Sequence, residues 1–327
     1  MTSYILRRTA GLAPILLLAA TIVWFFLFAL PGDPARLIAG GQGLDPDVLR
    51  SIRAEWGLDA PPWRQYLGYL QKLLCLDFGT SYIQRRPVAA ILHDHFPATL
   101  ILAISAVALS STAGLLFGGL AAYRQGRLTD GLVMLLALLG ASTPVFWLGL
   151  MLMLVFGSWL AWVPPLGYGM DGPMIPLVGI RLPEWRHLIL PSLTLCLVSL
   201  GTVARITRTS LLESGNAEFL RTALAKGASP WRVFTHHVLK NALLPVVTVV
   251  GMDFASLLGG AVATEYVFAW PGLGKTLVRA IALRDLPLVE GCVIVLTAIF
   301  VIVNLVVDLL YVQLDPRIHY ETGAQGS

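Results

Sequence analysis

Long apolar runs without charged side chains alternate with polar segments along the whole chain. Residues 9–32, 96–123 and 131–170 contain no Asp, Glu, Lys, Arg or His. An apolar run of about 20 residues crosses a bilayer as a helix. The pattern predicts six spans, at about residues 10–30, 97–122, 131–156, 188–207, 243–266 and 289–312. We therefore predict an all-α membrane protein with six transmembrane helices.

The segment after the first span, residues 31–96, has an amphipathic pattern instead. Asp45 is a suitable cap, Pro46 a suitable first residue and Gly57 a suitable end for a helix in PDVLRSIRAEWG. Apolar residues share one face of this helix (Val48, Leu49, Ile52, Trp56) and of a second helix in PWRQYLGYLQKLL (Trp63, Tyr66, Leu67, Leu70, Leu74). We expect an ordered extracytoplasmic segment whose helices pack on the outer surface of the membrane domain.

The composition excludes an ordinary soluble domain. Apolar residues make up 56% of the 327 residues, charged residues only 13%, and the mean hydropathy is +0.74. Soluble domains carry roughly 25% charged residues. The chain is therefore expected to be a multi-pass membrane protein.

Lysine and arginine residues beside the spans predict the orientation, because positive residues gather on the cytoplasmic side. With the N-terminus inside, the inner segments hold more of these residues (Arg7, Arg8, Arg124, Arg127, Arg205, Arg208, Arg221, Lys226, Arg232, Lys240, Arg317) than the two shorter outer loops (Arg181, Arg186, Lys275, Arg279, Arg284). The long segment after the first span adds seven more outside, but segments above about 60 residues count weakly in this rule. Both termini are expected in the cytoplasm. The apolar run after Arg8 exceeds the core of a signal peptide and no A-x-A-like site follows it, so the first helix should stay uncleaved.

Cysteine and histidine spacing indicates neither a disulfide framework nor a zinc site. Cys75, Cys196 and Cys292 are scattered, and no C-x-x-C pair occurs. The HDH cluster at residues 93–95 leaves a metal site open as an alternative, but closely spaced histidines alone are weak support for one. We predict no metal and no other cofactor bound by this chain.

A polar segment between the fourth and fifth spans reads ESGNAEFLRTALAKGASPWRVFTHHVLKNALLPVV. Asn216 can cap a short helix that stops at Gly227, since glycine favours the left-handed conformation at helix ends. Ser229 then caps a second helix with Pro230 at its first position. Basic residues on both arms would suit a DNA-binding helix-turn-helix. However, both ends of the segment run directly into membrane spans, so a DNA duplex would have to dock against lipid headgroups, and we do not expect DNA binding. We predict a stiff helical elbow that passes motion from a cytoplasmic partner to the bundle.

RTALAKG followed by LLP resembles the cytoplasmic loop of ABC importer permeases, in the form found in the dipeptide, oligopeptide and nickel branch. The general family pattern is E-A-A-x-x-x-G followed by I-x-L-P. Here RTA at residues 221–223 stands where E-A-A would, Gly227 matches, and the spacing to LP at residues 244–245 is longer. Further segments are similar to this branch in the same order: LPGDPARL, LDFGTSY, FPATL, STPVFWLGL, HLILPSLTL, GGAVATEYVFAWPGLGK and NLVVDLLYVQLDPRI.

The resemblance implies a permease subunit of the bacterial inner membrane. Its partners would be a second homologous permease, two cytoplasmic ATP-binding subunits and an extracytoplasmic solute-binding protein. ATP and magnesium would bind to the partner subunits, so this chain would be non-catalytic. The ATPases would contact a coupling loop made of Arg221, Thr222, Ala223, Lys226, Gly227, Ala228, Ser229, Pro230 and Trp231. The domains would be the first helix with the outer segment (1–96), a five-helix permease core (97–315) and a cytoplasmic tail (316–327).

AWPGLGKT, residues 269–276, differs by one residue from the phosphate-binding loop G-x-x-x-x-G-K-[ST]. That loop needs a preceding β-strand and a following helix, so that backbone N–H groups converge on phosphate. Here the preceding residues, GGAVATEYVF, belong to the fifth span, and the expected topology places the segment outside. We interpret it as a Gly/Pro-rich turn and not as a nucleotide site.

Several polar residues lie at membrane depth, where ionisable groups are costly and usually face a bundle interior or a water-filled path. Asp253 and Glu265 in the fifth span are our candidates for the translocation path. The sixth span adds Glu290, Asn304 and Asp308. The alternative is a structural role, through hydrogen bonds between helices or pairing with Arg205 or Arg208.

Two other classes of protein remain as alternatives. A secondary transporter or channel without an ATPase partner should show inverted repeats or broken helices. An intramembrane enzyme should show a paired nucleophile and base, or a metal set. The sequence indicates none of these features. For the cargo, peptides, glutathione-like peptides, nickel and metal chelates all remain candidates, with a slight preference for peptides.

Overall fold

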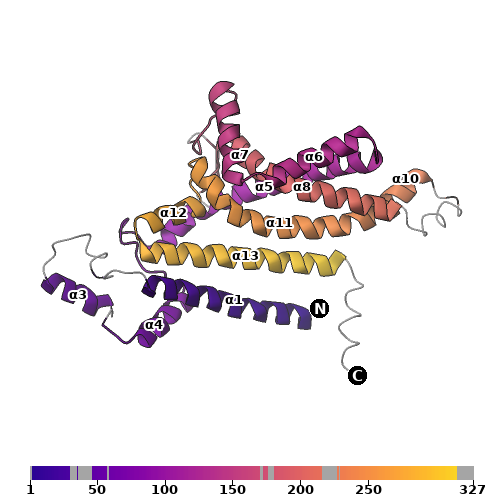
Figure 1. The fold of residues 1–327 in the computed structure, drawn as a ribbon. Helices are drawn as coiled ribbons and strands as arrows, with labels where there is room; N and C mark the ends of the chain where they lie inside the picture. The colour runs from indigo at the N-terminus through magenta and orange to yellow at the C-terminus, as the bar shows by residue number, and fades with distance from the viewer. Residues whose placement is uncertain are drawn as a thin grey trace. The chain divides into compact units, whose positions relative to one another are not determined.

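The apolar runs of the sequence form long helices. The computed structural model describes residues 2–29, 35, 46–56, 59–169, 172–175, 180–215, 227 and 229–314. Within these ranges, four helices are long and apolar enough to cross a membrane: α5 (Val88–Tyr123), α8 (Trp185–Gly215), α11 (Leu239–Val267) and α13 (Leu286–Leu314) (Figure 1). A fifth crossing results if α6 (Leu128–Ser142) and the bent helix after it count as one span.

The first predicted span coincides with α1 (Thr2–Ala29). The part of α1 whose side chains are described, Gly11–Phe26, is apolar but shorter than a full crossing. The prediction of a predominantly helical membrane protein is confirmed, and the count of six spans stays a prediction.

The third predicted span is broken in the structure. After α6, the chain turns into α7 (Val145–Leu152), which continues as the π-helix η1 (Met153–Trp159) at 108° to α6 (Figure 1). The break follows from Pro144: a proline disfavours the helical conformation of the residue before it, and Thr143 is extended, with φ −88° and ψ 132°. The expectation that the chain contains no broken helix is therefore wrong.

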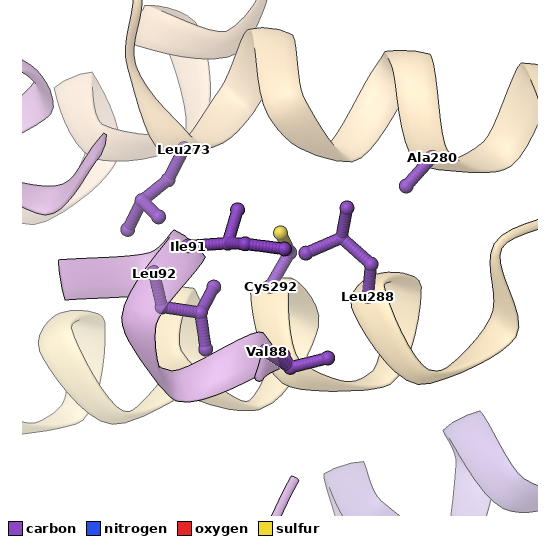
Figure 2. Close-up of a cluster of buried hydrophobic side chains, with 7 residues drawn as sticks. All are labelled: Val88, Ile91, Leu92, Leu273, Ala280, Leu288 and Cys292. Carbon is purple, nitrogen blue, oxygen red and sulfur yellow. The ribbon is translucent and has the colours of Figure 1, made fainter. Parts of the chain in front are cut away.

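The chain divides into two compact units. The first comprises residues 1–98 and 271–299, and the second residues 99–270 and 300–327. In the first unit, apolar side chains from the start of α5, from α12 (Leu273–Ala282) and from the start of α13 form a buried core (Figure 2). This core holds Val88, Ile91, Leu92, Leu273, Ala280, Leu288 and Cys292.

Two amphipathic helices follow α1, as predicted. They are α3 (Pro46–Trp56) and α4 (Pro62–Leu74). Asp45 and Gly57, and the side chains of Val48, Ile52 and Trp56, lie outside the described residues.

The apolar face of α4 is only partly covered within the first unit. The hydroxyls of Tyr66 and Thr21 share a hydrogen bond of 2.7 Å, and the Tyr66 ring meets Trp24 edge-on at 5.2 Å. Tyr66 therefore packs α4 against α1, whereas Trp63 and Leu74 of the same helix are exposed.

A buried carboxylate organises the loop that leads into α5. Asp285, which directly precedes α13, is 1% exposed. It accepts hydrogen bonds from the Ser81 hydroxyl and, at 3.0 Å, from the Tyr82 backbone N–H. The loop is thus fixed to the start of α13.

In the second unit, α8 packs against both α6 and α11 (Figure 1). Glycines let the backbones approach closely: a Cβ on Gly201 of α8 would collide with the Ala137 carbonyl of α6, and one on Gly140 of α6 with the Leu197 carbonyl of α8. Small residues at helix contacts are common in membrane proteins. Between η1 and α8, two short strands, β1 (Met174–Ile175) and β2 (Ile180–Arg181), pair antiparallel.

Candidate coupling loop and translocation path

The segment that contains the predicted coupling loop follows α8, which ends at Gly215. Five of its predicted contact residues lie outside the described residues: Arg221, Thr222, Ala223, Lys226 and Ala228. Gly227 is described and exposed, and its φ is +83°. This is the left-handed conformation that we predict for the end of the elbow's first arm.

The second arm of the elbow is a helix, as predicted. The Arg232 backbone N–H points at the Ser229 hydroxyl oxygen over a long 3.4 Å, and α10 (Pro230–Val233) starts with the proline. The chain then continues through the π-helix η2 (Phe234–Val238) into α11 without an intervening turn. The backbone from residue 230 to the fifth span is therefore continuously helical, which suits it to carry motion along its axis.

A bidentate ion pair joins α6 to α8. Both carboxylate oxygens of Asp130 accept hydrogen bonds from the Arg208 guanidinium, each at 2.7 Å. Asp130 also accepts the Gly126 backbone N–H at 3.0 Å, in the turn just before α6. The Asp130 side chain is buried, and parallel N–H···O bonds of this kind are among the strongest that side chains make.

This pair was not foreseen from the sequence. The sequence suggests acidic residues of the fifth and sixth spans as possible partners of Arg208, whereas in the structure it pairs with Asp130. The only sequence signal is the position of both residues beside the cytoplasmic ends of their spans. That position is shared by several other charged residues, so it does not identify the partners.

Asp253 lies on α11 and contacts α8. It is half-buried and accepts a hydrogen bond from the hydroxyl of Ser199, which is itself buried. The contact joins the two helices that lead into and out of the coupling loop. A place in the translocation path stays a prediction for Asp253.

Glu265, near the other end of α11, is completely buried. Its carboxylate accepts a hydrogen bond from the Thr99 hydroxyl at 2.6 Å, and its backbone carbonyl accepts one from the Trp270 backbone N–H at 2.8 Å. Trp270 is buried too, with its ring edge-on to Tyr168 at 4.7 Å. In this conformation Glu265 belongs to the packed interior of the second unit, so lining a path would require the surrounding helices to separate.

The other polar candidates have separate local surroundings. Asn304 donates to the Phe300 carbonyl of its own helix at 2.9 Å. Glu290 lines a cavity of about 390 Å³ in the first unit.

The HDH cluster does not form one site. Asp94 pairs with Arg86 at 2.8 Å, while His95 Nδ1 lies 2.8 Å from the Pro271 carbonyl. His93 is exposed and 3.9 Å from Asp94. Within the described residues, no group of three or more His, Cys, Asp or Glu is arranged to hold a metal ion.

The first half of AWPGLGKT, residues 269–272, is a turn between two helices, as predicted, whereas residues 273–276 already form the start of α12. Helix α11 precedes it, Ala269 has a φ of +54°, and Gly272 is the residue before α12. The Thr276 hydroxyl donates to the Gly272 carbonyl at 2.8 Å. A helix therefore stands where a phosphate-binding loop has its β-strand.

Two family descriptions together match almost the whole chain. "Binding-protein-dependent transport system inner membrane component" matches residues 114–320. "Binding-prot-dependent transport system membrane comp, N-term" matches residues 1–103.

Curated relatives match over nearly their full length. A putative peptide transport system permease protein of Brucella suis is 41% identical over 321 residues, which is 98% of this chain and 100% of that protein. The glutathione transport system permease protein of Salmonella typhimurium is also 41% identical over 321 residues, with the same coverage.

Solved structures share the fold at low sequence identity. An inward-facing methionine ABC transporter superposes with a TM-score of 0.54 and 18% identity, covering 69% of this chain and 97% of that one. An amino acid ABC transporter gives a TM-score of 0.52 and 13% identity, covering 69% and 94%. At such identities the likeness concerns the fold alone.

Proposed function

Since this chain belongs to the family of binding-protein-dependent transport system inner membrane components and is a permease subunit of an ABC importer, we propose that it forms half of a translocation path for peptides. The observation that carries this substrate class is the 41% identity, over 98% of the chain, to permeases named for peptide and glutathione transport. The chain is a multi-pass inner-membrane protein. We take its cargo to be small peptides, with glutathione-like peptides included.

The proposed assembly contains a second, homologous permease, two cytoplasmic ATP-binding subunits and an extracytoplasmic solute-binding protein. Each permease crosses the membrane six times, with both termini in the cytoplasm. ATP and magnesium bind to the partner subunits, and this chain is non-catalytic. The helix α11 before AWPGLGKT supports that division of labour, because a phosphate-binding loop requires a β-strand in that place.

The coupling loop receives the movement of the ATPases. Gly227 turns the chain, and the helical backbone that starts at Pro230 continues into α11. On the other arm, α8 is joined to α6 through the ion pair of Arg208 with Asp130. Displacement of the loop would therefore reach α11 directly, and it would reach α6 through α8, which packs against α6 and also forms this ion pair with it.

Movement of these helices would switch the path between outward- and inward-facing states. Packed helices have discrete arrangements, and a nucleotide or ligand shifts their balance only by its differential affinity for the two states. Asp253 and Glu265 are the residues that we expect at the path, exposed to cargo in one of the two states. The contacts to Ser199 and Thr99 would be exchanged during the switch.

The break between α6 and α7 is the feature that a secondary transporter would share. The energy source separates the two classes. An ABC importer needs ATP hydrolysis by its partners, whereas a secondary transporter needs an ion gradient and no ATPase.

The test is reconstitution from gently solubilised membranes. The tagged chain is purified with its partners, placed in proteoliposomes with the binding protein outside, and supplied with ATP inside. We expect uptake of a labelled dipeptide or glutathione that stops without ATP, and no turnover by the chain alone. Uptake of nickel in place of peptide would contradict the proposed cargo. Uptake driven by an ion gradient, without any ATPase, would contradict the proposal that the complex is an ABC importer.

A further inference from the structure

A cavity of about 390 Å³ lies in the first unit, outside the coupling loop and the candidate path. It is formed by α4, by the loop before α5, by the start of α13 and by Trp24 of α1. Its volume falls within the range of roughly 300–1,000 Å³ typical of small-molecule pockets. Both apolar and charged side chains line it.

A carboxylate without a close partner faces this cavity. Glu290 is half-buried on the first turns of α13, and no hydrogen bond or close ion pair joins it to another residue that the structure describes; only the more distant positive charge of Lys72 acts on it. Partly desolvated carboxylates are costly unless something compensates the charge. The cavity therefore holds an acidic group that a ligand could satisfy.

A buried hydroxyl beside it is also without a partner. Tyr69 lines the cavity, and its hydroxyl oxygen makes no hydrogen bond in the described part of the chain. Burial, and next the negative charge of Glu290, raise the pKa values of Tyr69 and Tyr82 above the usual range. Both phenols therefore stay protonated, and each can donate or accept a hydrogen bond next to the carboxylate.

Positive charge lies on the exposed side of the same cavity. Lys72, in the last turn of α4, and Arg64, stacked over the Trp63 ring at 5.0 Å, both contribute to the lining and are exposed. An acid with unpartnered hydrogen-bonding capacity and cations at the rim are complementary to a molecule that carries both charges.

We propose that this cavity binds a zwitterion whose primary ammonium contacts Glu290 and Tyr69 and whose anionic group contacts Lys72. Two sources supply this chemistry. One is the phosphoethanolamine headgroup of a lipid, for which Trp24, Leu73 and Ile294 offer an apolar wall to the acyl chain. The other is a free peptide, with its ammonium and carboxylate. The inference does not depend on the proposed cargo.

The test uses the intact importer and isosteric variants. Native mass spectrometry counts the phosphatidylethanolamine and phosphatidylglycerol molecules that each complex retains, and equilibrium dialysis measures binding of labelled alanylalanine. Glu290→Gln removes the charge and Tyr69→Phe removes one oxygen. Asp94→Asn and Tyr123→Phe make the same changes outside the cavity. Because hydrogen bonds to charged groups are strong, we expect Glu290→Gln to weaken binding by about tenfold or more.

The outcomes separate the two sources. Preferential retention of phosphatidylethanolamine, lost in Glu290→Gln and kept in the controls, identifies the lipid. Saturable alanylalanine binding, lost in the same variant, identifies the peptide. Equal retention of both lipids together with peptide binding that neither cavity variant changes would overturn the site. If Glu290→Gln fails to assemble, Tyr69→Phe decides alone, since it keeps the ring and the packing.

Discussion

Gly227 combines a left-handed backbone with open surroundings. Among the residues that the structure describes, none has an atom within 4 Å of a Cβ added there, so we expect a substitution to act mainly through the backbone. The left-handed conformation costs a residue with a Cβ roughly 1–2 kcal/mol. We expect Gly227→Val to lower peptide uptake per ATP hydrolysed severalfold, because the elbow no longer holds its shape. Uptake and phosphate release are measured on the same proteoliposomes.

Gly215 provides the matched control for this substitution. Its Cβ position also meets no atom of the described residues within 4 Å, but Gly215 lies at the helical end of α8 without a positive φ. Gly215→Val should leave the ratio of uptake to hydrolysis near that of the unmodified protein. Equal ratios for both variants would show that the turn at Gly227 has no part in coupling.

Local chemistry explains which residues of the site could be predicted. The left-handed backbone at Gly227 and the helix that starts at Pro230 depend on conformational preferences of a few adjacent residues, which can be recognised in a sequence. The partner of Arg208 is 78 residues away and is chosen by helix packing, which no local preference encodes. The cavity at Glu290 depends in the same way on how distant elements pack.

Asp130 of α6 and Arg208 of α8 form an ion pair that joins the two helices. Removing one partner of a buried pair leaves a charge uncompensated, so each single variant should destabilise the complex. We expect Asp130→Asn and Arg208→Gln each to lower the thermal unfolding temperature. The double variant should lose less stability than the sum of the two single losses. The double-mutant cycle should give a coupling of about 0.5–3 kcal/mol. Additive losses would mean that the pair does not join the two helices.

Because α6 and α8 approach closely at Gly201, adding a single methyl group there should lower the stability of the complex. Gly201→Ala would push a Cβ into the Ala137 carbonyl, and such overpacking typically costs about 1–3 kcal/mol. A Cβ on Gly131 of α6 meets no described residue within 4 Å, so Gly131→Ala should be neutral or slightly stabilising. Unfolding temperatures of the detergent-solubilised complexes compare the two. Indistinguishable temperatures would argue against the close approach.

Prediction of the elements succeeded where periodicity and caps were clear. The run PWRQYLGYLQKLL coincides with α4, because its apolar spacing and its leading proline both favour a helix there. The break at Thr143 and Pro144 was missed because the apolar run continues through it. Hydropathy measures only the apolar character of such a run, whereas the threonine–proline step decides whether the helix stays straight.

Across the whole molecule, the native cysteines offer a test of orientation. Cys75 is exposed, whereas Cys196 and Cys292 are buried. If residues 31–96 are extracytoplasmic, a membrane-impermeant maleimide should label Cys75 in intact spheroplasts, and Cys75→Ser should abolish that labelling. Labelling that appears only after the membrane is permeabilised would place Cys75 on the cytoplasmic side and contradict the proposed orientation.

The corner between α6 and α7 has a consequence for the lipids around the importer. With 15 residues, α6 is about 22 Å long, against a hydrocarbon core of about 30 Å. A helix this short creates a hydrophobic mismatch, which a bilayer relieves by thinning at a cost of fractions of a kcal/mol per Å. The rate of transport should therefore depend on the thickness of the membrane. In vesicles of graded acyl-chain length, we expect uptake to be fastest in thin bilayers and to decline as the chains lengthen.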